Sequence, residues 1–170
     1  MKPILFNTEM VRAILDGGKT QTRRPVHSAH LNRYASPKYC VGDILYVRET
    51  WGTWSPTFGT MPRIYYRADY DAPDSIVWRP SIHMPKEAAR IFLRVTDVKV
   101  ERLQDITIND IEAEGISADY AEIALSNPDR GKFIKLWNGT ASDFDRYGWD
   151  ANPWVWVIKF ERISKEEAEG

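Results

Sequence analysis

Cysteine and long apolar runs are nearly absent from the sequence. Cys40 is the only cysteine, so the chain cannot form an internal disulfide or a zinc site built from several thiolates. No apolar stretch approaches the roughly 20 residues that a membrane-spanning helix needs, and the N-terminus lacks the apolar core of a signal peptide. These absences predict a protein of the reducing cytoplasm without a membrane segment.

A large net charge of one sign is missing as well. The chain has 23 Lys and Arg residues against 24 Asp and Glu residues, which gives a formal net charge of -1. A nucleic-acid partner would therefore have to be bound by a local basic patch rather than by the field of the whole protein.

The length and composition are typical of one globular domain. The 170 residues are 43% apolar and 28% charged, which is enough to bury a core and too short for two ordinary domains. We expect a single domain over residues 1–163 and a charged tail over residues 164–170 that frays. No internal repeat is visible, and no pattern indicates an oligomeric state.

Aromatic side chains are abundant, with seven Trp and eight Tyr residues that gather mainly in segments 46–78 and 137–156. Aromatics at this density either fill a core or line a groove that stacks nucleic-acid bases. One aromatic row shares a face of a predicted strand, which favours the core: Trp154, Trp156 and Phe160. Trp51 and Trp54 follow a charged strand end, and one of them is a candidate for stacking a base beside Arg48.

Alternation and β-branched composition mark the strands, whereas apolar periodicity and capping signals mark the helices. The predicted strands are residues 2–6, 44–51, 63–68, 90–103 and 154–160. The predicted helices are residues 8–16, 108–114, 118–125 and 129–137. Loops are predicted over residues 26–38, 52–62, 69–89 and 140–153. Strands that do not alternate regularly with helices favour an α+β fold with a mixed or antiparallel sheet, closed into a small barrel and flanked by helices.

One stretch combines glycines, hydroxyls and cations: Gly17-Gly18-Lys19-Thr20-Gln21-Thr22-Arg23-Arg24. Gly17 stands where a helix usually ends, because glycine adopts the left-handed conformation at little cost. Cations beside hydroxyls and exposed amides suit a phosphate or another anion. The stretch is therefore predicted to be an anion-binding turn that ends at Pro25, with a solvated basic loop as the alternative.

The spacing Gly17-x-Lys19-x-x-Thr22-x-Arg24 resembles the G-x-K-x-x-T-x-R signature of the ASCH domain family, a group of PUA-like β-barrels. Flanking features recur in the same order as in that family: the preceding amphipathic helix, a turn at 41–43 that leads into a strand, a segment at 106–116 containing Glu114-Gly115, and a closing strand at 154–161. The resemblance covers most of the chain and implies a PUA-like mixed or antiparallel barrel.

Two further segments, 47–51 and 152–157, resemble uncharacterised ASCH-like proteins of bacteriophages and prophages. That narrower resemblance implies action in the cytoplasm of a bacterial host.

The family resemblance implies recognition of RNA or of a modified nucleoside or nucleotide. Small bacterial members are amidohydrolases that remove the acetyl group from N4-acetylcytidine with a lysine, a threonine and a glutamate. By position these residues are Lys19, Thr22 and Glu114. Thr22 would attack the acetyl carbonyl, Lys19 would take its proton, and Glu114 would protonate the leaving amine. Arg24 would stabilise the developing oxyanion or bind a phosphate.

The identity of the acid is open. Glu49 ends an apolar strand face and competes with Glu114 for this role, or else is a buried ion-pair partner of Arg48 or Arg24. Arg23 is either a ligand-binding cation or a structural, solvent-facing one. The candidate ligand-binding residues are Arg23, Arg24, Arg48, Glu49 and Trp51.

His27, His30 and His83 lack the spacing of a metal site, so neither a metal nor another cofactor is expected. Three classes of function are left. The principal hypothesis is a module that binds RNA or a modified nucleoside or nucleotide. The alternatives are an amidohydrolase that acts on an acylated cytidine and a phage structural or interaction protein without a ligand.

Overall fold

A computed structural model describes residues 1–26, 37–55, 61–69, 73–116 and 128–170 of the chain. The helix expected at 118–125 lies outside these residues, as does most of the loop expected at 26–38, with His27 and His30. None of the helices in the described ranges is long and apolar enough to cross a lipid bilayer.

Seven strands and five α-helices occur within the described residues. The strands are β1 (Lys2–Leu5), β2 (Gln21–Pro25), β3 (Ile44–Arg48), β4 (Trp51–Trp54), β5 (Arg63–Tyr66), β6 (Phe92–Arg102) and β7 (Trp154–Ile163). The α-helices are α1 (Thr8–Leu15), α2 (Ile108–Ala113), α4 (Pro128–Thr140), α5 (Phe144–Tyr147) and α6 (Lys165–Glu169). Short 3-10 helices are η2 (Ser81–His83), η3 (Lys86–Ala88) and η4 (Leu103–Asp105).

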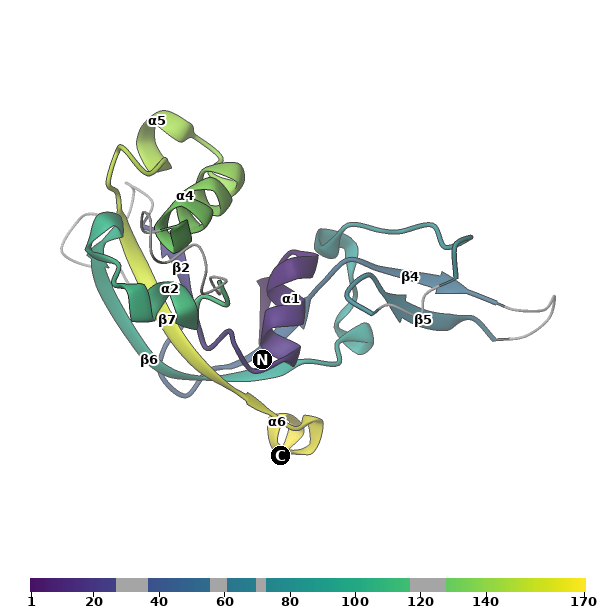
Figure 1. Cartoon of the computed structure of the whole chain (residues 1–170). Coiled ribbons are helices and arrows are strands. Elements are labelled where there is room, and N and C mark those ends of the chain that lie inside the picture. Colours follow the sequence, from purple (N-terminus) through teal and green to yellow (C-terminus); the bar gives the residue numbers. More distant parts are fainter. Residues whose placement is uncertain (27–36, 56–60, 70–72, 117–127) are drawn as a thin grey trace.

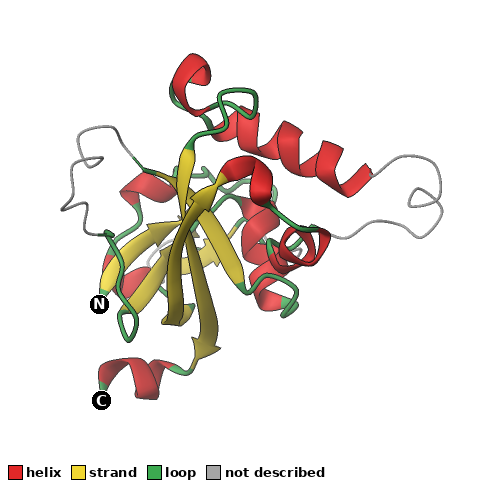
Figure 2. Ribbon diagram, turned by 90° about the vertical axis from the view of Figure 1, so that its left-hand side faces the viewer, coloured by secondary structure: helices red, strands yellow, loops and turns green. Residues whose placement is uncertain are grey.

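Five of the strands form one mixed sheet in the order β1-β3-β6-β7-β2. β1 runs parallel to β3, and the other neighbours are antiparallel. β6 and β7 form the longest pair, and their register shifts between Val95 and Asp97. Figure 2 shows these strands crossing at the centre of the molecule with helices around them. The predicted α+β class with a mixed sheet is confirmed.

The sheet is open, whereas the sequence predicted a closed barrel. β1 and β2 are its edges, and no ladder joins them among the described residues. A side chain connects them instead: Arg24 Nη2 donates a hydrogen bond to Leu5 O at 3.0 Å, and the guanidinium lies 5.3 Å from the centre of the Phe6 ring. In a closed barrel, backbone hydrogen bonds would join β1 to β2. Here the Arg24 guanidinium makes the contact between these two strands. Both edge strands also contain a proline, Pro3 in β1 and Pro25 in β2.

β7 separates two hydrophobic clusters because its successive side chains point to opposite faces of the sheet. Val155 and Val157 pack in the cluster that α2 and α4 cover. Ile158 and Phe160 pack in the cluster that α1 covers. The strand is therefore buried on both faces, which explains its nearly continuous apolar sequence.

The aromatic row of β7 is only partly in the core. Phe160 is 4% exposed and Trp156 packs against the same cluster, as predicted. Trp154 is 39% exposed and lies under Arg102, whose guanidinium is 4.4 Å from the ring centre. The prediction for Trp154 was wrong because this residue is the first of β7 and lies at the end of the sheet.

The segment after β3 does not continue as one strand. The sequence predicted a strand over 44–51 and a loop over 52–62, but β3 and β4 are separate, and β4 pairs antiparallel with β5. The chain is divided because Glu49 is only 1% exposed and turns into the protein, while the backbone of Trp51 pairs with Arg79.

β4 and β5 project from the main sheet as an arm (Figure 1). We use "the arm" for the described residues between 49 and 90. A third cluster anchors its root to β6 and β7: Trp51, Met84, Ala88, Ala89, Phe92 and Ile163. The arm is thus fixed through buried apolar contacts to the end of the β6-β7 pair where Phe92 lies opposite Ile163.

The C-terminal tail forms helix α6, whereas the sequence predicted that residues 164–170 fray. Ser164 Oγ accepts a hydrogen bond from Glu167 N at 3.2 Å, and the Glu167 carboxylate accepts one from Ser164 N at 2.9 Å. This capping box is a known helix start signal. Ala168 packs against the cluster at the root of the arm, which gives the short helix a tertiary contact.

Two glycines allow the ends of α1 and α2 to meet. Gly17 ends α1 with a φ of 80°, and Gly115 follows α2 with a φ of 81°. A Cβ at Gly115 would lie 2.6 Å from Ala13 Cβ and 2.9 Å from Lys19 Cβ. Both predicted helix ends are confirmed, and the second is also a point of close packing.

We predict that Gly115→Ala lowers the free energy of unfolding by about 1–3 kcal/mol, because alanine is strained at positive φ and its methyl group meets two neighbours. Urea denaturation followed by tryptophan fluorescence measures the change. Gly131→Ala in α4 is the control, since nothing lies within 4 Å of its added Cβ; there alanine should raise the free energy of unfolding by about 0.5–1 kcal/mol. Equal effects would contradict the close packing at Gly115.

Candidate functional site

The basic motif forms an edge strand of the sheet. Lys19 N donates a hydrogen bond to Ala13 O at 3.0 Å, and Thr20 N donates one to Ala113 O at 2.8 Å. The chain therefore leaves α1, touches α2 and enters β2. Four polar side chains of the motif are at most 2% exposed: Lys19, Gln21, Thr22 and Arg23. The prediction of a turn is wrong from Gln21 onward, and a solvated basic loop is excluded.

Glu114 joins two buried cations. Lys19 Nζ donates hydrogen bonds to Glu114 Oε2 at 2.8 Å and to Glu114 O at 2.9 Å. Arg23 Nη1 donates one to Glu114 Oε1 at 3.1 Å. The three side chains are at most 4% exposed. Removing one partner of such a buried pair leaves an uncompensated charge, so these contacts are strongly coupled.

Two further carboxylates compensate Arg23. Its Nη2 lies 2.6 Å from Glu101 Oε1 and 3.5 Å from Asp110 Oδ2. Gln21 Nε2 donates a hydrogen bond to the same Asp110 side chain at 3.1 Å. The guanidinium of Arg23 is thus occupied by acids of β6 and α2, which favours a structural role for this residue.

Burial lowers the pKa of Lys19, although the charge and hydrogen bond of Glu114 oppose this shift. Burial also lowers the pKa of Arg24, again against the attraction of Glu114. An arginine remains protonated at any ordinary pH. Lys19 is therefore the cation whose proton is easier to remove than usual.

Arg24 differs from its neighbours because its described contacts are to neutral acceptors. Its Nη1 donates to Thr22 Oγ1 at 2.7 Å and to Arg23 O at 2.9 Å, and its Nη2 donates to Leu5 O at 3.0 Å. No carboxylate lies within 4.0 Å of Arg24 among the described residues. A guanidinium has five N–H donors, so two of those on Arg24 remain for a ligand.

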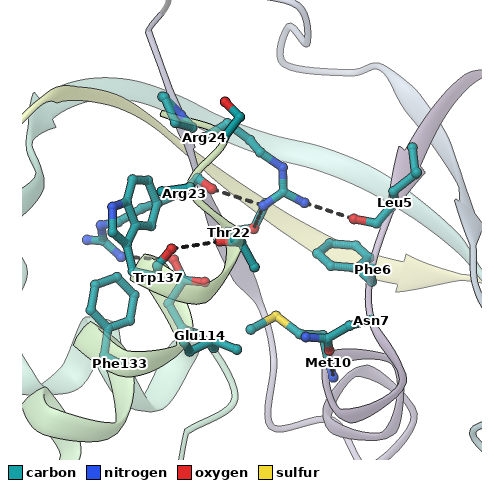
Figure 3. A pocket seen from close by; sticks show the side chains of 15 residues that line it. Leu5, Phe6, Asn7, Met10, Thr22, Arg23, Arg24, Glu114, Phe133 and Trp137 are labelled. Carbon is teal, nitrogen blue, oxygen red and sulfur yellow. Dashed lines mark hydrogen bonds and ion pairs between the residues drawn. The ribbon is translucent and has the colours of Figure 1, made fainter. Parts of the chain in front are cut away.

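A pocket of about 300 Å³ opens beside β2. Thr22, Arg24 and Glu114 supply polar groups to its lining. Figure 3 shows Phe133 and Trp137 of α4 on one side of these groups. The apolar side chains on the other side are Leu5, Phe6 and Met10. The predicted residues Thr22, Arg24 and Glu114 therefore line one cavity. Lys19 is not among the lining residues but donates a hydrogen bond to Glu114.

The other predicted acid lies elsewhere. Glu49 accepts hydrogen bonds from Arg90 Nε at 2.9 Å and Arg90 Nη2 at 3.1 Å, and Arg90 Nη1 donates to Asp69 at 2.8 Å. Burial raises the pKa of Glu49, and Arg90 opposes that shift. Glu49 is thus a buried ion-pair partner, as one of the two interpretations predicted, but the partner is Arg90.

Arg48 and Trp51 also lie apart from the pocket lining. Arg48 donates hydrogen bonds to the carbonyl groups of Met84 and Ile82. Trp51 is 7% exposed, and the Arg79 guanidinium lies 5.2 Å from its ring centre. Both residues hold the arm together. In the part of the chain that the structure describes, no group of three His, Cys, Asp or Glu side chains is placed to hold a metal ion.

The pocket contains residues that sequence reasoning did not assign to a site. Phe133 and Trp137 were predicted only as an apolar helix face, and Phe6 only as part of a strand. Their spacing carries no sign of a cavity, because an i, i+4 aromatic pair looks the same whether it faces a core or a ligand. Here both aromatics of α4 belong to the second cluster and also line the pocket.

No protein-family model and no curated protein matched the sequence. The structure, in contrast, is similar to solved structures at low sequence identity. The crystal structure of protein EF3133 from Enterococcus faecalis, described as DUF984, has a TM-score of 0.53 and 12% identity, covering 100% of this chain and 82% of that chain. This chain shares the fold of EF3133.

A second solved structure is an ASCH domain from Lactobacillus crispatus, with a TM-score of 0.43 and 13% identity over 91% of this chain and 71% of that one. Identity this low transfers a fold and no ligand.

Glu114→Gln is predicted to lower the free energy of unfolding by about 3–5 kcal/mol, because it leaves the Lys19 and Arg23 charges buried without their shared carboxylate. Urea denaturation at neutral pH measures the loss. Glu161→Gln is the control: its pair with Arg94 is exposed, so about 0–1 kcal/mol is expected. A similar small loss in both variants would mean that the charges of Lys19 and Arg23 are compensated without Glu114.

Asp110 predicts a dependence of stability on acidic pH. Partial burial acts to raise its pKa, but hydrogen bonds from Thr107 and Gln21 outweigh that effect and lower the pKa to about 2. A carboxyl group with a lowered pKa stabilises the fold above its unfolded-state value of about 3.9, and this contribution disappears as the pH falls toward 2. We expect Asp110→Asn to show a shallower loss of stability between about pH 4 and pH 2. Acid unfolding experiments in which the free energy of unfolding of Asp110→Asn falls with pH as steeply as that of the wild type would contradict this prediction.

Proposed function

We propose that the pocket beside β2 binds a nucleoside or nucleotide unit of RNA. The observation that carries the proposal is Arg24: it lines the pocket, has no described carboxylate partner and retains two N–H donors. A guanidinium in this state suits a phosphate or a base carbonyl, because charge-assisted hydrogen bonds to such acceptors are strong. The neutral contacts to Thr22 Oγ1 and Leu5 O hold it in place without neutralising it.

The apolar walls of the pocket support a base as the ligand. Phe6 and Trp137 supply aromatic surface, and Trp137 Nε1 already donates to Tyr147 O at 2.7 Å. The indole therefore needs no polar partner from a ligand and can offer its ring. Thr22 and Glu114 add a hydroxyl and a carboxylate that accept hydrogen bonds. A mostly apolar cavity with a few fixed polar groups is the usual form of a small-ligand site.

An amidohydrolase that removes the acetyl group from an acylated cytidine is the second candidate. Its support is the lowered pKa of Lys19, next to Glu114 and close in sequence to Thr22. The mechanism requires Lys19 to pass a proton to Glu114 and then take the Thr22 hydroxyl proton. The described hydrogen bonds join Lys19 to Glu114 and Thr22 to Arg24. Catalysis therefore requires the Thr22 hydroxyl to form a contact with Lys19 in place of Arg24, whereas binding requires no such rearrangement.

Calorimetric titration with cytidine monophosphate and with N4-acetylcytidine tests the proposal. Arg24→Gln should weaken binding of the phosphate-bearing ligand about ten- to hundredfold, the loss expected for a hydrogen bond to a charged group. Arg94→Gln is the control, since Arg94 lies on β6 with an exposed partner. Equal affinity in wild type and Arg24→Gln, or no affinity in either, would contradict the binding function.

Chromatography of the N4-acetylcytidine samples separates the two candidates. A binding module leaves the ligand intact. A hydrolase converts it to cytidine, and Thr22→Ala abolishes this turnover while Thr22→Ser retains part of it, because serine keeps the nucleophilic hydroxyl. Full turnover by Thr22→Ala would exclude Thr22 as the nucleophile.

A further inference from the structure

One face of the arm presents alternating arginine and aromatic side chains. Trp54 of β4 lies opposite Arg63 of β5, and Gly52 lies opposite Tyr65. Cross-strand neighbours and residues two apart share a face of a sheet, so Trp54, Arg63 and Tyr65 lie on the same side. Arg67 continues the row, because its N donates to Thr50 O at 2.9 Å and so extends the pairing by one residue.

Trp78 joins this face from the segment that crosses over Gly52. A Cβ at Gly52 would lie 2.6 Å from Ile76 Cγ2 and 3.7 Å from Trp78 Cε3, so only glycine lets the segment pack this closely. The Arg67 guanidinium lies 5.2 Å from the centre of the Trp78 ring. We use "the arm face" for this surface, whose members are Trp54, Arg63, Tyr65, Arg67 and Trp78.

The rings of the arm face are accessible and fixed. Trp54, Tyr65 and Trp78 are half-buried, which leaves part of each ring open. Trp54 and Tyr65 meet edge to face, with ring centres 6.4 Å apart. Rings held in this way bind a flat partner without losing much conformational freedom.

The arginines of the arm face carry uncompensated charge. Arg63 and Arg67 are exposed, and neither forms an ion pair with any described residue. The described part of the arm has two exposed carboxylates, Asp74 and Glu87, and neither lies within 4.0 Å of these arginines. The arm face is therefore locally cationic on a chain whose net charge is -1.

The arm and the pocket are joined through α1. Asn7 and Met10, at the start of this helix, line the pocket. Arg12 on the same helix donates hydrogen bonds to Ala68 O at 3.0 Å and to Arg67 O at 3.3 Å. The backbone that carries Arg67 is thus held by the helix that bounds the pocket.

We propose that the arm face binds single-stranded RNA, with bases stacked on its aromatic rings and phosphates bound by Arg63 and Arg67. Stacking surfaces interleaved with cations are the common means of holding single strands, because every base has a face and every nucleotide a phosphate. The uncompensated charge favours this polyanion over an apolar protein partner. The inference rests on the proposed function for the choice of RNA, and it makes the ligand a strand rather than a free nucleoside.

Fluorescence anisotropy with a labelled RNA of about 12 unpaired nucleotides tests the proposal, since stacking platforms cover about 4–16 nucleotides. Trp54→Leu should weaken binding about fivefold or more. The double variant Arg63→Gln, Arg67→Gln should weaken it and should reduce the slope of log affinity against log salt by about 0.7 per arginine. Trp54→Leu should leave that slope unchanged.

Arg146→Gln is the control for the arginine variants, because Arg146 is 70% exposed on α5, outside the arm. It should bind the RNA as the wild type does. Urea denaturation of each variant establishes that the fold is kept. Because both arm arginines are exposed, their substitution should change the free energy of unfolding by about 0.5 kcal/mol or less.

The outcomes separate the arm from the pocket. Loss in the arm variants supports the inference whether or not the wild type binds cytidine monophosphate; if it does not, only the pocket proposal fails. Arm variants that bind the RNA like the wild type overturn the inference, whatever Arg24→Gln does. A wild-type protein without affinity for the RNA also overturns the inference. So does a Trp54→Leu variant that binds the RNA with unchanged affinity, because the inference depends on stacking of a base on Trp54.

Discussion

The ion pairs of Glu114 with Lys19 and Arg23 join the C-terminal end of α2 to the segment that leads from α1 into the edge strand β2. Glu114 stands at the C-terminal end of α2, where a carboxylate opposes the helix dipole. Two cations from the chain between α1 and β2 offset that cost. Because these charges are buried, their pairing and the backbone ladder with β7 together hold β2 in place.

The same ion pairs distinguish the cations of this segment by the charge of their partners. Lys19 and Arg23 are held by carboxylates, whereas Arg24, one residue further along the strand, has neutral neighbours. The same division recurs in the arm, where Arg90 is bound between Glu49 and Asp69 while Arg63 and Arg67 form no ion pair with any residue that the structure describes. The cations of the described residues thus divide into those held by carboxylates, such as Lys19, Arg23 and Arg90, and those without a carboxylate within 4.0 Å, such as Arg24, Arg63 and Arg67.

Local signals predicted much of the fold, and contacts between distant segments explain what they missed. The helix ends at Gly17 and Gly115 and the strands β6 and β7 follow from short-range chemistry. The inward turn of Glu49 does not, because its partner Arg90 is 41 residues away. The pocket was predicted in part: the motif spacing pointed to Thr22 and Arg24, and the family resemblance proposed Glu114 with Glu49 as the alternative. The aromatic walls of the pocket come from segments whose patterns suit any core.

The prolines in the two edge strands have a consequence for how this protein can meet other molecules. A sheet edge is normally open to a further strand, from a peptide or from a second copy of the chain. Pro3 and Pro25 each remove a backbone donor from such an edge, and the Arg24 side chain lies across the interval between them. Growth of the sheet by strand addition is therefore disfavoured on both sides. At these two edges of the main sheet, another molecule would have to be recognised by side chains rather than by backbone pairing.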